Sequence, residues 1–287
     1  MKLSYLLYCL LLSTTPMYSF SLHKSWASLN ALFCTKQKQN PWEDVIGKEE
    51  LMALAHEIKN SLQDPTKKAS EIENLLLVGA TQTGKTFWAQ ALCSYLRHIS
   101  NETIVTISFT KAEAIAAGGL SNIFKWAAKF TTPCVIFLDD LDLYNQSKID
   151  TAEENLVTEL YSLKKESNNK VMVIAATNEP DLLDYAIIKC NYFPRKISFN
   201  YPSYEQRKEA LAKEFKRHNI QMQWFTAKPL TKEETSEFIA KLAETTAGLS
   251  FNGISNLITT ALTYADKAGR APSYKDFDKT IRIQRLD

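Results

Sequence analysis

Between about residue 42 and residue 201, short apolar runs alternate with longer segments in which apolar residues recur three and four positions apart. The short runs are typical of strands buried on both faces of a sheet, and the longer segments are typical of amphipathic helices. This alternation predicts βαβ units and therefore an α/β fold with a doubly wound parallel sheet. The five predicted strands cover residues 75–78, 104–107, 135–138, 171–175 and 197–199.

The pattern changes after Pro202, where no strand-like run follows and helical spacing continues to the end of the chain. Thr231 and Glu234 have the spacing of a capping box, and Gly269 suits the position just after a helix. The predicted helices cover residues 203–218, 231–245, 251–268 and 273–283, and the last three are expected to form a small all-α bundle. With the boundary near Tyr201, the predicted domains are an α/β domain at 41–201 and a helical domain at 202–287.

The first 42 residues contain no Asp or Glu, and residues 3–12 are almost wholly apolar. This run is shorter than the ~20 residues that span a bilayer, and it suits the hydrophobic part of a signal peptide better. We therefore predict a hydrophobic signal or anchor segment at 1–22, followed by a linker at 23–40. A helix packed on the domain and translation from Met17 are the alternatives.

If the segment is kept as an anchor, the lysines that follow it favour the cytoplasmic side for the rest of the chain. These are Lys24, Lys36 and Lys38. The expected location is a membrane, with the α/β domain in the cytoplasm. A cleaved signal peptide is the other reading of the same segment.

Composition narrows the classes of partner. The 34 basic and 32 acidic residues leave a net charge of only +2, which counts against a nucleic-acid partner. The five cysteines are widely spaced and form no C-x-x-C pair, so neither a disulfide framework nor a zinc site is predicted. A reducing compartment fits this cysteine usage best.

Residues 79–86 match the phosphate-binding loop G-x-x-x-x-G-K-[ST]. The loop follows the first predicted strand and opens a predicted helix at 85–96, the context in which backbone N–H groups bind phosphates. Lys85 is expected to reach the β and γ oxygens of ATP, and the Thr86 hydroxyl to bind Mg²⁺. The alternative interpretation of the motif is a glycine turn beside a surface lysine, and such a turn would not require the flanking strand and helix. The predicted phosphate-binding residues are Gly79, Ala80, Thr81, Gln82, Thr83, Gly84, Lys85 and Thr86.

Two carboxylates, Asp139 and Asp140, follow the apolar run at 134–138. A strand that enters an acidic surface loop is common, but after a phosphate-binding loop this is the Walker B pattern. Asp139 is then expected to hold Mg²⁺ through its water shell, and Asp140 to orient or deprotonate the attacking water.

Asn178 stands at the polar end of another apolar run, 171–177. Ligands of parallel sheets lie outside the carboxyl ends of the strands, so Asn178 could contact the γ-phosphate or the attacking water. The alternative is an asparagine that only begins the turn before Pro180.

Taken together, these segments resemble the AAA family of ATPases, within the AAA+ P-loop superfamily, from about Trp42 to the C-terminus. The sequence W-E-D-V-I-G at 42–47 is similar to the family's opening F-x-D-V-x-G. P-C-V-I-F-L-D-D-L-D at 133–142 resembles P-C-I-I-F-I-D-E-I-D, and A-T-N-E-P-D-L-L-D-Y-A at 176–186 resembles A-T-N-R-P-D-x-L-D-P-A. Residues 249–250 and 273–277 are similar to the family's helical lid.

The resemblance implies that the backbone of Val45, Ile46 and Gly47 lines the adenine pocket. It also implies an ATP- and Mg²⁺-dependent ATPase that forms a homo- or hetero-oligomer and acts on a protein substrate, with 202–287 as its lid. The AAA module of the membrane-bound AAA proteases is similar, but the sequence has no H-E-x-x-H. Its His56-Glu57 pair is followed by Ile-Lys-Asn, so metalloprotease activity of that type is not expected.

Departures from the family pattern predict slow hydrolysis. Asp140 replaces a catalytic glutamate and is one methylene shorter, and a displacement of about 1 Å can cost ~10² in rate. The two arginine-finger positions hold Lys189 and Tyr192, neither of which has the guanidinium fork that is worth ~10³ or more. Replacing both with arginine is therefore expected to raise turnover.

Two further departures concern the pore and the lid. The pore motif maps to Ile115-Ala116-Ala117 and lacks its aromatic residue, which counts against threading of a polypeptide. The lid positions that are usually Gly-Ala hold Phe251 and Asn252.

The favoured hypothesis is a slow Mg²⁺-dependent ATPase that remodels a protein partner or assembly, with or without a partner ATPase. The alternative is a non-catalytic scaffold in which ATP stabilises one assembly state. A DNA-replication loader is a third hypothesis, because Asp-Asp Walker B ends occur in that branch. The A-T-N-E-P-D segment and the near-neutral charge count against it.

Overall fold

The computed structural model describes residues 40–109, 119–142, 156–166, 169–183, 192–220 and 231–284. The predicted segment 1–22, the linker apart from its last residue, the pore-motif positions 115–117 and Lys189 lie outside these ranges. Within the described ranges, no helix combines the length and the hydrophobicity that crossing a membrane requires.

The five described strands form one parallel sheet in the order β2-β3-β4-β1-β5. This arrangement confirms the predicted doubly wound α/β fold. Because β1, β3 and β4 are close neighbours and parallel, the loops after their carboxyl ends meet at one edge of the sheet. The strands are β1 (Leu75–Gly79), β2 (Val105–Phe109), β3 (Cys134–Leu138), β4 (Val171–Thr177) and β5 (Arg195–Phe199).

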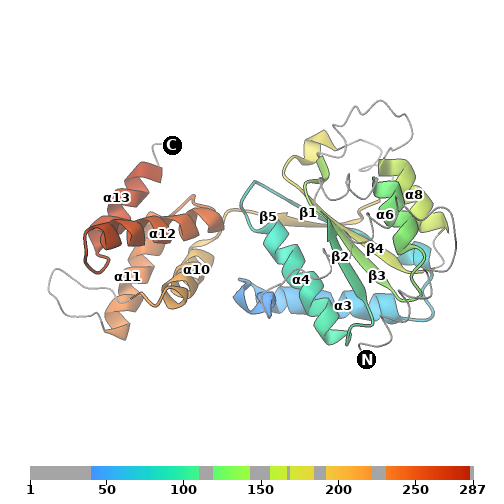
Figure 1. The fold of residues 1–287 in the computed structure, drawn as a ribbon, viewed down its shortest axis with the longest axis horizontal. Helices are drawn as coiled ribbons and strands as arrows, with labels where there is room; N and C mark the ends of the chain where they lie inside the picture. Colours follow the sequence, from blue (N-terminus) through green and yellow to red (C-terminus); the bar gives the residue numbers. More distant parts are fainter. Residues whose placement is uncertain are drawn as a thin grey trace, which may run out of the picture.

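Alternate residues of the strands are buried in two separate hydrophobic cores, one on each face of the sheet. Leu75 and Leu77 pack with α3 (Lys48–Gln63) and α4 (Lys85–Ile99). Leu76 faces the other way and packs with α6 (Leu120–Ala127) and α8 (Leu156–Glu166). The sheet is therefore covered on both sides, as its apolar strands require, and Figure 1 shows these helix pairs around it.

The rest of the described chain is a helical region that follows β5 (Figure 1). The Thr231 hydroxyl accepts from Glu234 N at 3.2 Å, and the Glu234 carboxylate accepts from Thr231 N at 2.8 Å, which confirms the predicted capping box. Gly269 has the expected left-handed conformation, with φ +62°. The helices are α10 (Tyr204–Arg217), α11 (Lys232–Thr245), α12 (Phe251–Lys267) and α13 (Tyr274–Gln284).

The helical region has its own hydrophobic core, which includes α10 as well as the three helices predicted to form a bundle. Leu211 and Phe215 of α10 are buried with Phe238, Ile254 and Phe277 of the other helices. Helical spacing identifies the apolar face of α10, but it does not say which helices that face meets.

Candidate functional site

The loop at 79–86 joins β1 directly to α4, as the sequence predicts. Gly79 pairs with Phe199 of β5, and a Cβ atom at residue 79 would stand 2.1 Å from the Phe199 carbonyl oxygen. Gly84 has φ +96° at the start of α4, which is strained for any residue with a side chain. Both glycines are thus required by the backbone of the loop itself.

Lys85 folds back over this loop and is only 6% exposed. Its Nζ donates to the carbonyl oxygens of Gly79 and Ala80 and to Asn178 Oδ1, each at 2.7 Å. Burial lowers the pKa of the Lys85 ammonium, while Asp139, Asp140 and Asp142 act in the opposite direction. The ammonium is therefore held on the loop by its acceptors and by three nearby carboxylates.

Thr86 in the first turn of α4 and Asp139 after β3 meet at the carboxyl edge of the sheet, where the Thr86 hydroxyl donates to Asp139 Oδ1 at 3.1 Å. Burial raises the pKa of the Asp139 carboxyl, and the neighbouring Asp140 raises it further, against the hydrogen bond from Thr86. A partly buried carboxylate beside a hydroxyl is an oxygen donor set that suits Mg²⁺. The residues present therefore fit that ion.

Asp140 turns the chain sharply after β3, with φ +50°. Its backbone N–H donates to Asp139 Oδ1 at 3.2 Å, and its own Oδ1 accepts from Asn178 Nδ2 at 3.1 Å. Aspartate tolerates this left-handed conformation better than longer side chains do.

Asn178 connects the two sides of the site. Its amide oxygen accepts from Lys85 and its amide nitrogen donates to Asp140. The side chain thus does more than begin a turn. Lys85 from the β1 loop, Asp140 from the β3 loop and Asn178 from the β4 loop form one hydrogen-bonded chain.

The predicted adenine segment lies where the α/β sheet and the helical region meet. Val45 is 3% exposed in the core under α3 and α4, whereas Ile46 packs against the core of the helical region. Lys213 of α10 donates to the Val45 carbonyl oxygen at 3.0 Å. Gly47, with φ +74°, begins α3. Sequence reasoning missed Lys213, since nothing in its spacing relates it to residue 45.

The helical region also contacts the phosphate-binding loop. The Ser250 hydroxyl donates to Gln82 Oε1 at 3.4 Å. A Cβ atom at Gly84 would lie 3.7 Å from Phe251 Cδ2, so the Phe251 ring stands next to the loop. The remaining predicted loop residues, Ala80, Thr81 and Thr83, lie between β1 and α4, with Thr83 donating to the Ala80 carbonyl oxygen at 2.8 Å.

Tyr192, one of the two expected finger positions, is buried in the core beside α6 and α8 and is 9% exposed. Its carbonyl oxygen accepts from the buried Asn74 side chain at 3.0 Å, and Asn74 also accepts from Val173 N of β4 at 2.9 Å. Arg195 begins β5 and pairs with Glu57 at 2.6 Å. Tyr192 is therefore part of the hydrophobic core, and an arginine there would be buried as well.

Sequence reasoning also missed Asp142 and Thr177, which lie next to the site. Asp142 Oδ1 accepts from the Thr177 hydroxyl at 2.7 Å and from Asn178 N at 3.3 Å. The signal that could have found Asp142 is a third carboxylate just after the two of the Walker B pattern.

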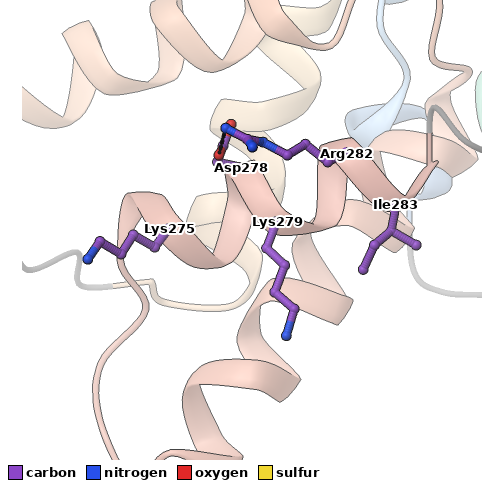
Figure 2. A pocket seen from close by; sticks show the side chains of 5 residues that line it. All are labelled: Lys275, Asp278, Lys279, Arg282 and Ile283. Carbon is purple, nitrogen blue, oxygen red and sulfur yellow. Dashed lines mark ion pairs between the residues drawn. The ribbon is translucent and has the colours of Figure 1, made fainter.

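A shallow hollow on α13 lies elsewhere, in the helical region, and Figure 2 shows the side chains that line it. Arg282 reaches back to Asp278 at 3.0 Å, as Figure 2 shows, and Lys279 lies 4.4 Å from the centre of the Tyr264 ring. These charges are satisfied by neighbours in the same region. The candidate site is therefore the cluster at the edge of the sheet.

Residues 75–201 match the family described as "ATPase family associated with various cellular activities (AAA)". This part of the chain is an AAA domain. Within the described residues, no group of three or more His, Cys, Asp or Glu side chains is placed to hold a metal ion, so the fit to Mg²⁺ rests on Thr86 and Asp139.

The relatives of this chain include proteins named ATP-dependent zinc metalloprotease FtsH. The protein from Thermotoga maritima is 30% identical over 261 residues, which cover 85% of this chain and 40% of that protein. The protein from Corynebacterium glutamicum is 29% identical over 246 residues, which cover 80% of this chain and 27% of that protein. The chain thus spans well under half the length of these relatives.

A solved structure, the FIGL-1 AAA domain in complex with ADP, is similar in fold. Its TM-score is 0.68 at 16% identity, and the match covers 94% of this chain and 92% of that one. At this identity the likeness concerns the fold alone, and it confirms an AAA-type α/β sheet followed by a helical region.

Proposed function

We propose that this AAA ATPase domain binds ATP with Mg²⁺ at the 79–86 loop and hydrolyses it slowly to remodel a protein partner or assembly. The observation that carries the proposal is the hydrogen-bonded cluster of Lys85, Asp140 and Asn178, with Thr86 and Asp139 beside it. Within this proposal, residues 41–201 bind the nucleotide and residues 202–287 form the lid.

Each residue of the cluster has a role in binding. The loop N–H groups and the N-terminus of α4 bind phosphate oxygens, and Lys85 neutralises charge on the β and γ groups. Thr86 and Asp139 would hold Mg²⁺, which supplies further charge neutralisation when bound. Val45, Ile46 and Gly47 receive the adenine between the two parts of the chain.

Asp140 and Asn178 are the proposed catalytic pair. The Asp140 carboxylate orients the attacking water and accepts its proton, and the Asn178 amide fixes the carboxylate through the 3.1 Å hydrogen bond. The same amide holds Lys85, so the group that binds the γ-phosphoryl and the group that positions water are linked.

Slow turnover is part of the proposal, because Tyr192 is buried and cannot contribute a charge to a neighbouring subunit. A partner ATPase that supplies an arginine in an oligomer would provide the missing stabilisation of the transition state. The same observation favours the second candidate, a scaffold that binds ATP without turning it over.

The test is thermal unfolding with and without MgATP, together with steady-state turnover. Binding should raise the stability of the wild type by ~2.7 kcal/mol at a hundredfold excess over Kd. Lys85→Ala should abolish this shift because the cation on the loop is lost, while Lys267→Ala, at an exposed position of α12, should keep it.

Equal shifts in the wild type and Lys85→Ala would remove the basis for this site. Turnover that falls with Asp140→Asn while binding persists supports the ATPase. Binding without turnover in the wild type supports the scaffold.

A further inference from the structure

Asp142 is a buried carboxylate, 6% exposed, that stands outside the proposed binding and catalytic residues. One of its oxygens, Oδ1, accepts from two successive residues of β4 and its loop. The Thr177 hydroxyl donates at 2.7 Å and the backbone N–H of Asn178 donates at 3.3 Å. A buried charge with two donors on one short segment fixes the backbone of that segment.

Thr177 completes the attachment. It is fully buried as the last residue of β4, and its hydroxyl oxygen accepts from Glu179 N at 3.1 Å while its proton goes to Asp142. Both capacities of the hydroxyl are therefore used. The turn at 177–179 is tied from both sides, and Asn178 projects from the middle of it.

Fixing the backbone of Asn178 also fixes its side chain in the phosphate site, where the amide contacts Lys85 at 2.7 Å and Asp140 at 3.1 Å. A small rotation of the 177–179 backbone would change both distances together, since they start from one planar amide. The Asp142 carboxylate also acts to raise the pKa of the Lys85 ammonium, against the effect of burial.

We propose that Asp142 is a positioning residue that, through Thr177 and the backbone of Asn178, sets the Asn178 amide and thereby the site's preference for ATP over ADP. This inference rests on the proposed function. The amide lies at the ammonium that meets the β and γ oxygens, so its displacement affects a nucleotide with a γ-phosphoryl group more than one without it.

The test compares Kd for MgATP and MgADP in the wild type with Kd in Asp142→Ala, Thr177→Val, Thr177→Ser and Asn178→Ala. Thr177→Val keeps the shape of the side chain and removes the hydroxyl, so it decides the question if Asp142→Ala does not fold. We expect Thr177→Val to weaken MgATP binding about tenfold and MgADP binding less than twofold. Thr177→Ser restores the hydroxyl and should restore the wild-type ratio.

A second measurement separates positioning from a general structural role. Thr177→Val combined with Asn178→Ala should be no weaker for MgATP than Asn178→Ala alone, because both changes act through the same amide. The inference would be overturned if Thr177→Val weakened the binding of MgATP and MgADP equally. It would also be overturned if Thr177→Val kept the wild-type preference for ATP while Asn178→Ala lost it. A wild type that binds neither nucleotide would instead overturn the proposed function, and the inference with it.

Discussion

At the scale of single residues, Asp140 combines two demands that act in opposite directions. Its φ of +50° favours a short polar side chain, whereas catalysis in the family uses the longer reach of glutamate. A glutamate would bring the carboxylate farther out, but it would strain the turn after β3. The aspartate therefore suits the local backbone at the expense of reach.

Asp140→Glu should raise turnover severalfold if reach limits the rate, and should lower the free energy of unfolding by about 0.5–1 kcal/mol because of the strained turn. Asp140→Asn, which tolerates the same φ, should bind MgATP and lack turnover without this loss of stability. Urea unfolding and steady-state turnover on the same preparations measure both effects. A fully stable Asp140→Glu protein would contradict the argument from backbone strain.

Tyr192 gives the second prediction at this scale, and it reverses an expectation drawn from the sequence. Since Tyr192 is 9% exposed in the core, Tyr192→Arg should bury an unmatched guanidinium and cost about 3 kcal/mol or more. The variant should therefore lose stability rather than gain turnover. Tyr192→Phe keeps the buried ring and is the control, with a loss of at most about 1 kcal/mol in urea unfolding.

At the scale of elements, α13 is fixed at its N-terminus by an ion pair. Arg270 donates to both carboxylate oxygens of Asp276 at 2.7 Å, and Ser273 N donates to the same carboxylate at 2.8 Å. The Arg270 guanidinium holds the pKa of Asp276 down at about 2, despite its burial. This attachment ties the loop after α12 to α13.

The depressed pKa makes the stabilisation dependent on pH. It is fully present above the unfolded pKa of about 4 and is lost as the pH falls toward the folded pKa of about 2. Asp276→Asn should lower the free energy of unfolding by about 1–2 kcal/mol at pH 7, after allowance for the exposed Arg270. The difference from the wild type should shrink between pH 4 and pH 2.

Asp278→Asn is the matched control on the same helix, because Asp278 pairs with an Arg282 that is 78% exposed. Its cost should stay below about 0.5 kcal/mol. Urea unfolding at pH 7 and pH 2 compares the two variants. An Asp276→Asn effect that persists unchanged at pH 2 would show that packing, and not the ion pair, stabilises this end of α13.

The predictability of the elements from sequence depended on their burial. Strands buried on both faces, such as β3 and β4, read as continuous apolar runs and were located within two residues. The edge strand β5 alternates between half-buried and exposed positions, so only its last three residues, 197–199, were recognised. Lys85, Asp139 and Asn178 were found because motif spacing fixes them. The contact between Asp142 and Thr177 was not predicted, because the sequence shows a third carboxylate after β3 but not which residue of another strand it meets.

At the scale of the whole molecule, one prediction concerns residues 1–22 and membranes. We predict that this apolar, acid-free segment brings the protein to a membrane with the ATPase domain on the ATP-containing side. Deletion of residues 1–20 should move most of the protein from the membrane to the soluble fraction after cell lysis. The same distribution for both proteins would mean that the segment is only part of the fold.

The close approach of Gly79 to Phe199 joins the start of the phosphate-binding loop to the end of β5, the strand that leads into the helical region. The chain leaves β5 at Phe199 and enters α10 five residues later. Arg207 of α10 donates to the Pro202 carbonyl oxygen in this connection at 2.8 Å. A methyl group at residue 79 would separate the edge strand β5 from β1. The helical region, which follows β5, would be displaced with that strand. Loss of nucleotide binding in such a variant would therefore result from displacement of the helical region as much as from a steric clash in the phosphate-binding loop.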